Sequence, residues 1–406
     1  SIGMIRVCAF TLFLENFGSE RLALVAILLA ITGTVVTLVI ERFTQRFSVG
    51  VRLYTILGTV IFGLIAFRIL LGISDNKAII FGLPLFFEIT YMLFSLQYLA
   101  LLSRLMNVRQ TKRLSGLARS GEFLAEMVGG LSIALLLRFV DVVDLLAVAI
   151  VATLLVVVIV RRTIKRFSGR LVLTNEDLSE SDQGHLLGLL RLRYVRLIGL
   201  CYGAYIFAYF FLDVAFYDYA SQKYPNQIQL AEFLGQFFAM TGFATLFAMV
   251  FLFAPFLRRF GILAAVLAFP IVIATGSIAV SLLEITDASV AIIFIVMVAT
   301  NGCRFVLQSA IWRPTWAILF QVLSDRQRMQ GTSLIEGVVD PFFGGVAGVC
   351  LYFLSDYLQW EPQRFLLILA AIMVLWIALG MIIHRMYLAN LVVSLQKRKL
   401  GELSLK

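Results

Sequence analysis

The sequence predicts an all-α, polytopic membrane protein with twelve transmembrane helices in two parallel six-helix repeats. Its composition points to a lipid environment, since 61% of the 406 residues are hydrophobic, 14% are charged and the mean hydropathy is +0.96. Apolar runs of about 20 residues, the length that crosses a hydrocarbon core of about 30 Å, recur along nearly the whole chain. One long polar segment, 169–188, divides these runs into two sets of six.

The first set predicts an N-terminal bundle over 1–161. Its helices are expected at 2–14, 20–40, 51–72, 78–103, 116–139 and 142–161. The first of them is short for a crossing, and the sequence opens in mid-pattern without Met. We therefore expect this helix to be truncated.

The second set predicts a C-terminal bundle over 194–387. Its helices are expected at 194–215, 229–255, 261–283, 288–312, 331–355 and 363–387. A linker at 162–193 joins the bundles, and a basic tail follows at 388–406. Because each set holds an even number of helices, the two repeats share one orientation and are related by an axis along the membrane normal. That architecture is typical of the major facilitator class.

The distribution of Lys and Arg predicts the orientation in the membrane. Basic residues gather on alternate loops, above all in 104–119, in 161–196 and in the tail, and the opposite loops carry only Arg21, Lys77, Arg138, Lys223 and Arg364. This asymmetry places the linker and the C-terminus in the cytoplasm and the protein in the cell inner membrane. The net charge of +10 is therefore a topology signal, and no nucleic-acid partner is predicted.

The residues that build enzymes and metal sites are missing from the pattern. The four cysteines fall inside apolar segments, where they act as small hydrophobic residues. One histidine, His185, lies in the linker and the other, His384, near the end of the last helix, so they cannot assemble a metal cluster. The sequence also has no phosphate-binding loop and no nucleophile triad. We predict no catalytic residue, no metal and no cofactor.

Three segments carry a resemblance to a known family. They are RQTKRLSGLARSGEFLAEMVGG at 109–130, LDVAFYDYASQKYPNQIQLAEFLGQFFAMTGF at 212–243 and WRPTWAILFQVLSDRQRMQGTSLIEGVVDPFFGG at 312–345. They resemble the ATP/ADP translocase-like (nucleotide transporter) family, and most of all its bacterial branch, in which the membrane domain is fused to HEAT repeats and often to a cyclic-nucleotide-binding domain. The resemblance covers essentially all twelve helices.

The resemblance implies a major facilitator fold and a small anionic substrate such as a nucleotide. It also implies a cytoplasmic HEAT-repeat partner, for which the amphipathic basic tail at 388–406 would be the connector. A membrane-surface helix is the other interpretation of this tail.

Few basic side chains are predicted at membrane depth. An anion that crosses a low-dielectric cavity needs basic partners, preferably the bidentate fork of Arg. Arg6 in the first helix and Arg304 in the tenth are predicted as the principal contacts, whereas Arg68 near the end of the third helix is expected to snorkel to the surface. The acidic members of the predicted substrate site are Glu88, Asp213 and Asp340.

The carboxylates at membrane depth outnumber these cations. We expect some of them to pair with Arg6 or Arg304 or to be protonated, since an unpaired charge at depth is expensive. An acidic surplus suits a proton- or cation-linked carrier better than a pure exchanger of polyanions.

A cationic loop that leads into a helix with carboxylates occurs in both halves, and it predicts an inner gate. In carriers of this class the cytoplasmic ends of helices 4, 5, 10 and 11 close that gate, and ion pairs between the halves would lock it. The residues predicted to do so are Arg109, Arg113, Glu122, Glu126, Arg326, Arg328 and Glu336. Helix capping is the alternative, because Ser333 and Glu336 fit a capping box and Ser120 would set Glu122 in a first helical turn.

Proline, glycine and aromatic residues add to the prediction. Pro341 after Asp340 should kink the eleventh helix, and Gly129-Gly130 and Gly344-Gly345 should allow close helix packing. Six aromatic residues are candidates for stacking on a base, although packing is the commoner role for such side chains. They are Tyr202, Tyr205, Tyr209, Tyr217, Trp312 and Trp316.

These features together predict a secondary-active carrier that moves an organic anion such as a nucleotide by alternating access, without ATP hydrolysis. Two alternatives stay open. One is a membrane-anchored sensor that relays ligand binding to cytoplasmic HEAT or cyclic-nucleotide-binding modules. The other is a carrier of lipids or lipophilic substrates, which the 35 Phe residues favour.

Overall fold

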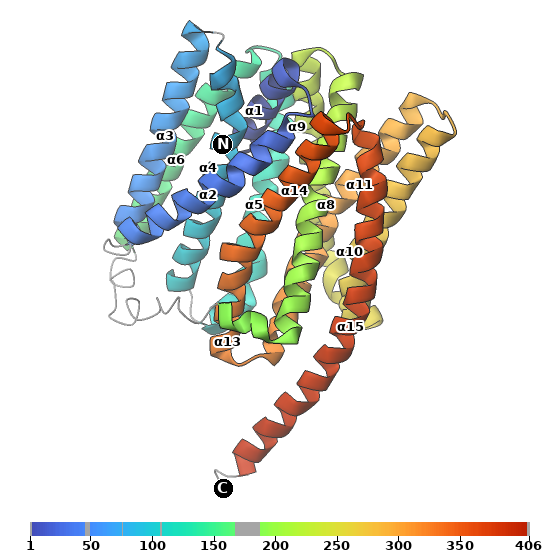
Figure 1. Cartoon of the computed structure of the whole chain (residues 1–406). Coiled ribbons are helices and arrows are strands. Elements are labelled where there is room, and N and C mark those ends of the chain that lie inside the picture. Colours follow the sequence, from blue (N-terminus) through green and yellow to red (C-terminus); the bar gives the residue numbers. More distant parts are fainter. Residues whose placement is uncertain (1, 45–48, 75, 106–107, 167–186, 404–406) are drawn as a thin grey trace. The chain divides into compact units, whose positions relative to one another are not determined.

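A computed structural model describes residues 2–44, 49–74, 76–105, 108–166 and 187–403. The described residues form helices joined by short connections, without a strand among them (Figure 1). The all-α prediction is therefore confirmed. The helices up to the linker are α1 (Ile2–Phe17), α2 (Leu22–Thr44), α3 (Val49–Ile73), α4 (Lys77–Leu105), α5 (Val108–Leu136), η1 (Val142–Asp144) and α6 (Leu145–Arg166).

The helices after the linker are more often interrupted. In chain order they are η4 (Leu187–Arg191), α8 (Arg193–Lys223), α9 (Gln227–Phe247), η5 (Ala248–Leu252), α10 (Phe253–Ile285), α11 (Val290–Leu307), η6 (Gln308–Trp312), α12 (Arg313–Leu319), η7 (Phe320–Val322), α13 (Asp325–Leu334), η8 (Ile335–Val339), α14 (Asp340–Tyr352), η9 (Phe353–Tyr357) and α15 (Pro362–Leu403).

Membrane-spanning helices are recognised by length and apolarity. Among the described residues, 8 helices are long and apolar enough to cross a membrane, and one of these runs continuously over Gln227–Ile285. That run bends at Gly261, where a φ of 74° falls in the region that favours glycine. Each predicted segment falls on helical backbone, but the count of twelve crossings stays a prediction.

Large apolar side chains on the outside of the helices support a lipid environment. Phe62 on α3 is 75% exposed and Phe139 after α5 is 86% exposed, and α6 exposes Leu155 and Ile159. Such surfaces are liabilities in water, whereas hydrocarbon solvates them well. The chain is a multi-pass membrane protein.

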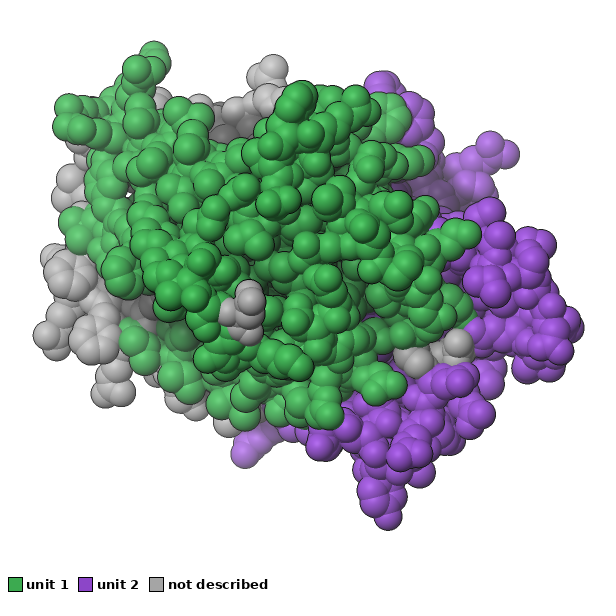
Figure 2. All heavy atoms as spheres, turned by 90° about the horizontal axis from the view of Figure 1, so that it is seen from above, with its two compact units in different colours: residues 1–182, 217–243 green, residues 183–216, 244–406 purple. Residues whose placement is uncertain are grey.

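The chain divides into two compact units, coloured separately in Figure 2. Unit 1 holds 1–182 and 217–243, and unit 2 holds 183–216 and 244–406. In unit 1, α3 packs against α4 and α6. In unit 2, α10 packs against α11 and α15. In each half of the chain, the helix predicted as the third therefore packs against those predicted as the fourth and the sixth. Two copies of one six-helix repeat would give this pattern, and the predicted bundle boundaries stay a prediction.

Helices α5 and α9 approach backbone to backbone inside unit 1. A Cβ atom on Gly130 would lie 2.3 Å from the Gly235 carbonyl oxygen and 2.8 Å from the Ala239 nitrogen, and one on Gly242 would lie 3.1 Å from the Phe123 carbonyl oxygen. Small residues of this kind let membrane helices come together closely. The close packing predicted at Gly129-Gly130 is thus found at Gly130, whereas the space beside Gly129 is open.

Proline explains three of the π-helical turns in unit 2. The turns η5, η6 and η8 end two or three residues before Pro255, Pro314 and Pro341. Proline has no N–H to donate to the carbonyl four residues earlier, and its ring crowds that carbonyl, so a wider turn relieves the helix there. The irregularity predicted at Asp340-Pro341 therefore takes the form of a π-turn followed by α14.

Helix α8 meets α14 at a glycine that the sequence pattern did not indicate. A Cβ atom on Gly203 would lie 2.6 Å from the ring of Phe343, while one on Gly344 would make an ordinary contact with Phe210 at 3.5 Å. The tight contact is therefore on the α8 side.

The two helix-capping interpretations are wrong. Helix α5 begins at Val108, so Glu122 lies well inside it, and the helical backbone continues from α13 through Ser333 and Glu336 into η8. The observed capping box belongs to Ser324, whose hydroxyl accepts from the Gln327 backbone N–H while the Gln327 side chain accepts from the Ser324 N–H. The helices begin early because the cationic segments are themselves rich in good helix formers.

Candidate functional site

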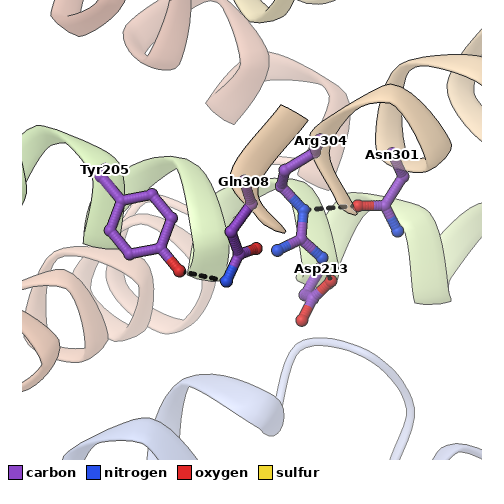
Figure 3. A network of polar contacts seen from close by, with 5 residues as sticks. All are labelled: Tyr205, Asp213, Asn301, Arg304 and Gln308. Carbon is purple, nitrogen blue, oxygen red and sulfur yellow. Dashed lines mark hydrogen bonds and ion pairs between the residues drawn. The ribbon is translucent and has the colours of Figure 1, made fainter. Parts of the chain in front are cut away.

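A network of polar side chains is buried in unit 2 between α8, α11 and η6 (Figure 3). Its centre is Arg304, whose side chain is 0% exposed. Arg304 Nη2 donates to Asp213 Oδ1 at 2.5 Å, and Arg304 Nε donates to Asn301 Oδ1 at 2.7 Å. The structure therefore joins Arg304 and Asp213, which the sequence predicted as separate members of the substrate site, into one ion pair.

Helix periodicity explains how the network forms. On α8, Tyr205 and Asp213 are eight residues apart and share a face with Tyr209 between them. On the facing element, Asn301, Arg304 and Gln308 follow one another at intervals of three and four residues. The Gln308 amide donates to the Tyr205 hydroxyl, so two antiparallel rows of polar side chains meet within the bilayer-spanning part of unit 2.

Two aromatic rings complete the surroundings of the guanidinium. Arg304 Cζ lies 4.3 Å from the centre of the Phe305 ring and 5.0 Å from that of Tyr209. A cation at this distance from a ring face is stabilised by the ring quadrupole, more so where water is excluded. Charge, amide and aromatic contacts thus hold Arg304 in one position.

The network contains buried polar atoms that have no hydrogen-bond partner among the described residues. They are Arg304 Nη1, Asn301 Nδ2 and Gln308 Oε1. An unsatisfied buried donor or acceptor is costly and rare enough to need an explanation. Two of the three are donors on adjacent groups, and a phosphate or carboxylate oxygen is the acceptor that best matches a guanidinium beside an amide.

The predicted aromatic residues have different environments. Trp312 is 2% exposed and packs edge-on against Trp376 at 4.7 Å, which indicates a packing role. Tyr217 is buried in unit 1, where it stacks on Phe10 at 4.7 Å. Tyr202 and Trp316 lie 5.1 Å apart and are partly exposed.

The second predicted cation, Arg6, lies in unit 1 on α1. Its Cζ atom is 4.0 Å from the centre of the Phe238 ring on α9 and 5.9 Å from that of Phe87 on α4. Glu88 follows Phe87 and is half-buried. Aromatic rings on α9 and α4 therefore contact the Arg6 guanidinium, and such cation–π contacts stabilise a cation that is shielded from water.

The predicted gate residues are described only in part. In unit 1, Glu122 is half-buried and accepts a hydrogen bond from the Tyr91 hydroxyl at 3.2 Å, and Glu126 is half-buried next to Gly242. In unit 2, Arg328 is exposed and Asp340 is half-buried at the start of α14. The side chains of the remaining members lie outside the described part of the structure, namely Arg109, Arg113, Arg326 and Glu336.

The structure adds residues that sequence reasoning did not single out. Asp144 pairs with Arg68 at 2.5 Å, with side-chain exposures of 33% and 36%, so this cation has a partner near the end of its helix. Asn301 and Gln308 were also missed. The signal that finds them is an amide three residues before and another four residues after an arginine within an apolar helix.

Comparison with solved structures gives the fold. The chain is similar to a bacterial homologue of the iron transporter ferroportin in its inward-facing state, with a TM-score of 0.65 and 11% identity over 92% of this chain and 94% of the other. It is also similar to a mutant of the nucleoside transporter NupG, with a TM-score of 0.60 and 12% identity over 94% and 98% of the two chains. These likenesses show that the chain shares its fold with the ferroportin homologue and with NupG.

Comparison of sequences gives the family. A search of curated proteins finds no match to this chain. The sequence profile of the TLC ATP/ADP transporter family, in contrast, matches residues 85–387, which is about three quarters of the chain and includes Asp213, Arg304 and most of the helices. This protein belongs to the TLC ATP/ADP transporter family of membrane transporters.

Proposed function

We propose that the protein is a secondary-active carrier that moves an organic anion, with a nucleotide as the first candidate, by alternating access and without ATP hydrolysis. The observation that carries this proposal is the fully buried Arg304, whose Nη1 atom and neighbouring Asn301 Nδ2 atom are donors without partners among the described residues. Burial of a guanidinium costs desolvation free energy. A ligand that brings a negative charge to the guanidinium would offset part of that cost.

The chemistry of Arg304 favours a phosphate or a carboxylate over a neutral substrate. Its planar fork can offer Nη1 to an anionic oxygen while Nε stays on Asn301. Asp213 would act as the resident counter-ion between transport cycles. Arg6, held by the rings of Phe238 and Phe87, is the proposed anion contact of unit 1. Glu88 and Asp340 are proposed as acidic residues of the same path.

The proposed gate closes through several ion pairs. Glu122 and Glu126 on α5, with Glu336 in η8, would supply the carboxylates, and the cationic segments ahead of them would supply the partners. Exposed pairs are each worth only about 0–1 kcal/mol, so several would have to act together to bias the inward-open against the outward-open state.

Transport of nucleotides by purified protein in proteoliposomes is the direct test. We expect saturable uptake of radiolabelled ATP or ADP that is accelerated by unlabelled nucleotide inside the vesicles, and no uptake of adenosine, which lacks the phosphate. Arg259→Gln is the matched control for Arg304→Gln. Arg259 is exposed and its Cζ atom lies 5.6 Å from the centre of the Phe260 ring, so this variant should transport like the wild type. A protein that binds ATP but moves neither nucleotide would favour the sensor function, and uptake of lipid alone would favour a lipid carrier.

The orientation in the membrane is proposed from the distribution of positive charge, with the linker and the C-terminal tail on the cytoplasmic side of the inner membrane. Helix α15 runs for 42 residues, longer than the about 20 that a crossing needs, and its sequence carries Lys397, Arg398 and Lys399 shortly before its last turn. This extension supports either a connector to a HEAT-repeat module or a membrane-surface segment.

Cysteine labelling tests the orientation. Single cysteines at Ser74, which follows α3, and at Ser181, which lies outside the described residues, are expected to react with an impermeant maleimide from opposite sides of the membrane. The background protein needs Cys303 replaced, because this native thiol is exposed. Labelling of both positions from one side would refute the proposed topology.

A further inference from the structure

The guanidinium that we assign to the anion already holds a negative charge. Arg304 Nη2 is engaged by Asp213 Oδ1, so an incoming anion brings a second negative charge to one cation whose side chain is fully buried. The site cannot keep both negative charges beside one positive charge without a large electrostatic penalty. One of the two must be neutralised when the anion binds.

We propose that Asp213 is a proton-binding site and that the carrier moves its anion together with one proton. This inference rests on the proposed function, because it assigns a coupling ion to the same site. The exposures of the two partners support it. The Arg304 side chain is 0% exposed, whereas that of Asp213 is 11% exposed, so the carboxylate is the member that a proton can reach.

Within the described part of unit 2, Arg304 is the cation that pairs with Asp213. On its own helix, Tyr205 and Tyr209 share its face. Among the described elements packed against α8 in unit 2, α14 brings Asp340 to the level of Gly199 and Gly203, which lie 14 and 10 residues, or about four and three helical turns, from Asp213.

The other neighbours of this part of α8 carry their charges elsewhere. Helix α15 contacts Phe211 through Phe365, and the adjacent Arg364 is exposed. On α11, Cys303 points outward as an exposed thiol. Protonation of Asp213 would therefore act on Arg304, the cation with which it is paired.

The proposed step conserves charge. A proton from one side of the membrane adds to a carboxylate oxygen of Asp213 and forms an O–H bond, and the ion pair with Arg304 Nη2 breaks. One negatively charged oxygen of the substrate accepts from Arg304 Nη1 and replaces Asp213 as the counter-ion, while Arg304 stays protonated throughout. On the other side the substrate leaves, the Asp213 O–H bond breaks, its proton passes to water and the ion pair forms again. The site has zero net charge both when it is empty and when it is loaded with one anionic group.

The Arg68–Asp144 pair of unit 1 provides the contrast. Its members are 36% and 33% exposed, so water solvates the charges and no coupled neutralisation is needed. Asp144→Asn is therefore the matched control for Asp213→Asn, since the same chemical change is made in an ion pair with the same separation of 2.5 Å.

The experiment uses the full chain in proteoliposomes with radiolabelled ATP as the probe. The external pH is held constant, so that the charge of external ATP does not change, and the internal pH is set either equal to it or one unit higher. With one proton per substrate, accumulation should rise by about tenfold per pH unit. Asp144→Asn should keep this response, whereas the uptake that Asp213→Asn retains should be the same at both internal pH values. A pH-sensitive dye inside the vesicles should report one proton entering with each ATP.

Each outcome decides the matter. Exchange by the wild type without any response to internal pH, or an unchanged response and proton flux in Asp213→Asn, overturns the assignment of the proton to Asp213. If the wild type neither accumulates nor exchanges ATP, ADP or any other labelled nucleotide, the proposed nucleotide transport is refuted and the coupling falls with it. Where Asp213→Asn is poorly expressed, the dye signal of the wild type decides alone, because uptake without proton entry excludes cotransport.

Discussion

Arg304→Gln is expected to reduce anion uptake by about 100-fold or more. Truncating one partner of a buried, hydrogen-bonded charge pair costs about 2–5 kcal/mol, and about 2.7 kcal/mol corresponds to a factor of 100. Gln cannot replace the guanidinium, because it carries no charge and cannot donate to both Asn301 Oδ1 and Asp213 Oδ1 while offering a further donor to the substrate. The measurement is the initial rate of labelled ATP uptake at equal protein content.

A double variant separates transport from folding. Arg304→Gln alone leaves Asp213 as an unpaired buried charge, which should lower stability by about 3–5 kcal/mol. Arg304→Gln combined with Asp213→Asn removes both charges and should recover most of the thermal stability in detergent while leaving uptake abolished. Uptake near the wild-type rate in the double variant would show that Arg304 does not contact the anion. A stability that stays low in the double variant would show that the unpaired charge is not what destabilises the single one.

The sequence was sufficient for the membrane class and the family, because both depend on local properties. Apolar runs such as 51–72 need only be long and uncharged to predict a helix, and α3 covers Val49–Ile73. Helix ends were harder to predict. The cationic segment ahead of Glu122 was expected to be a loop, but its residues favour helix as well, and α5 begins at Val108. A charged segment outside the bilayer can be a loop or the continuation of a helix, and its charge alone does not distinguish the two.

Two members of the buried network, Arg304 and Asp213, were predicted as single residues, but the network was not. Arg304 and Asp213 stand out because charge is rare at membrane depth, yet their pairing joins residues 91 positions apart in the chain. Asn301 and Gln308 are neutral and do not stand out against an apolar helix. Their relation to Arg304 appears only when the spacing of three and four residues is read together with the Tyr205, Tyr209 and Asp213 row of α8. Contacts between the two halves, such as the predicted gate pairs, depend on tertiary arrangement and cannot be found from local pattern.

Gly130→Ala is expected to destabilise the protein by about 1–3 kcal/mol or more, the usual cost of overpacking a close-packed interior. The added Cβ atom would lie 2.3 Å from the Gly235 carbonyl oxygen and 2.8 Å from the Ala239 nitrogen, and both are backbone atoms that cannot rotate away. Helices α5 and α9 would have to separate. Because α9 also carries Phe238, whose ring lies 4.0 Å from Arg6 Cζ, the separation should disturb the proposed anion contact of unit 1 and lower uptake as well.

The neighbouring glycine is the control for this last effect. A Cβ atom on Gly129 meets nothing within 4 Å, so Gly129→Ala should leave the packing intact and, since Ala favours helix over Gly by up to about 1 kcal/mol, should keep or raise the stability. Thermal denaturation followed by size-exclusion chromatography of both variants measures the difference. The two substitutions add the same methyl group to adjacent residues of one helix, so a general loss of helix quality would affect them alike. Equal melting temperatures would contradict a backbone-to-backbone contact at Gly130, whereas a loss confined to Gly130→Ala would show that the closeness of α5 and α9 is needed for the fold.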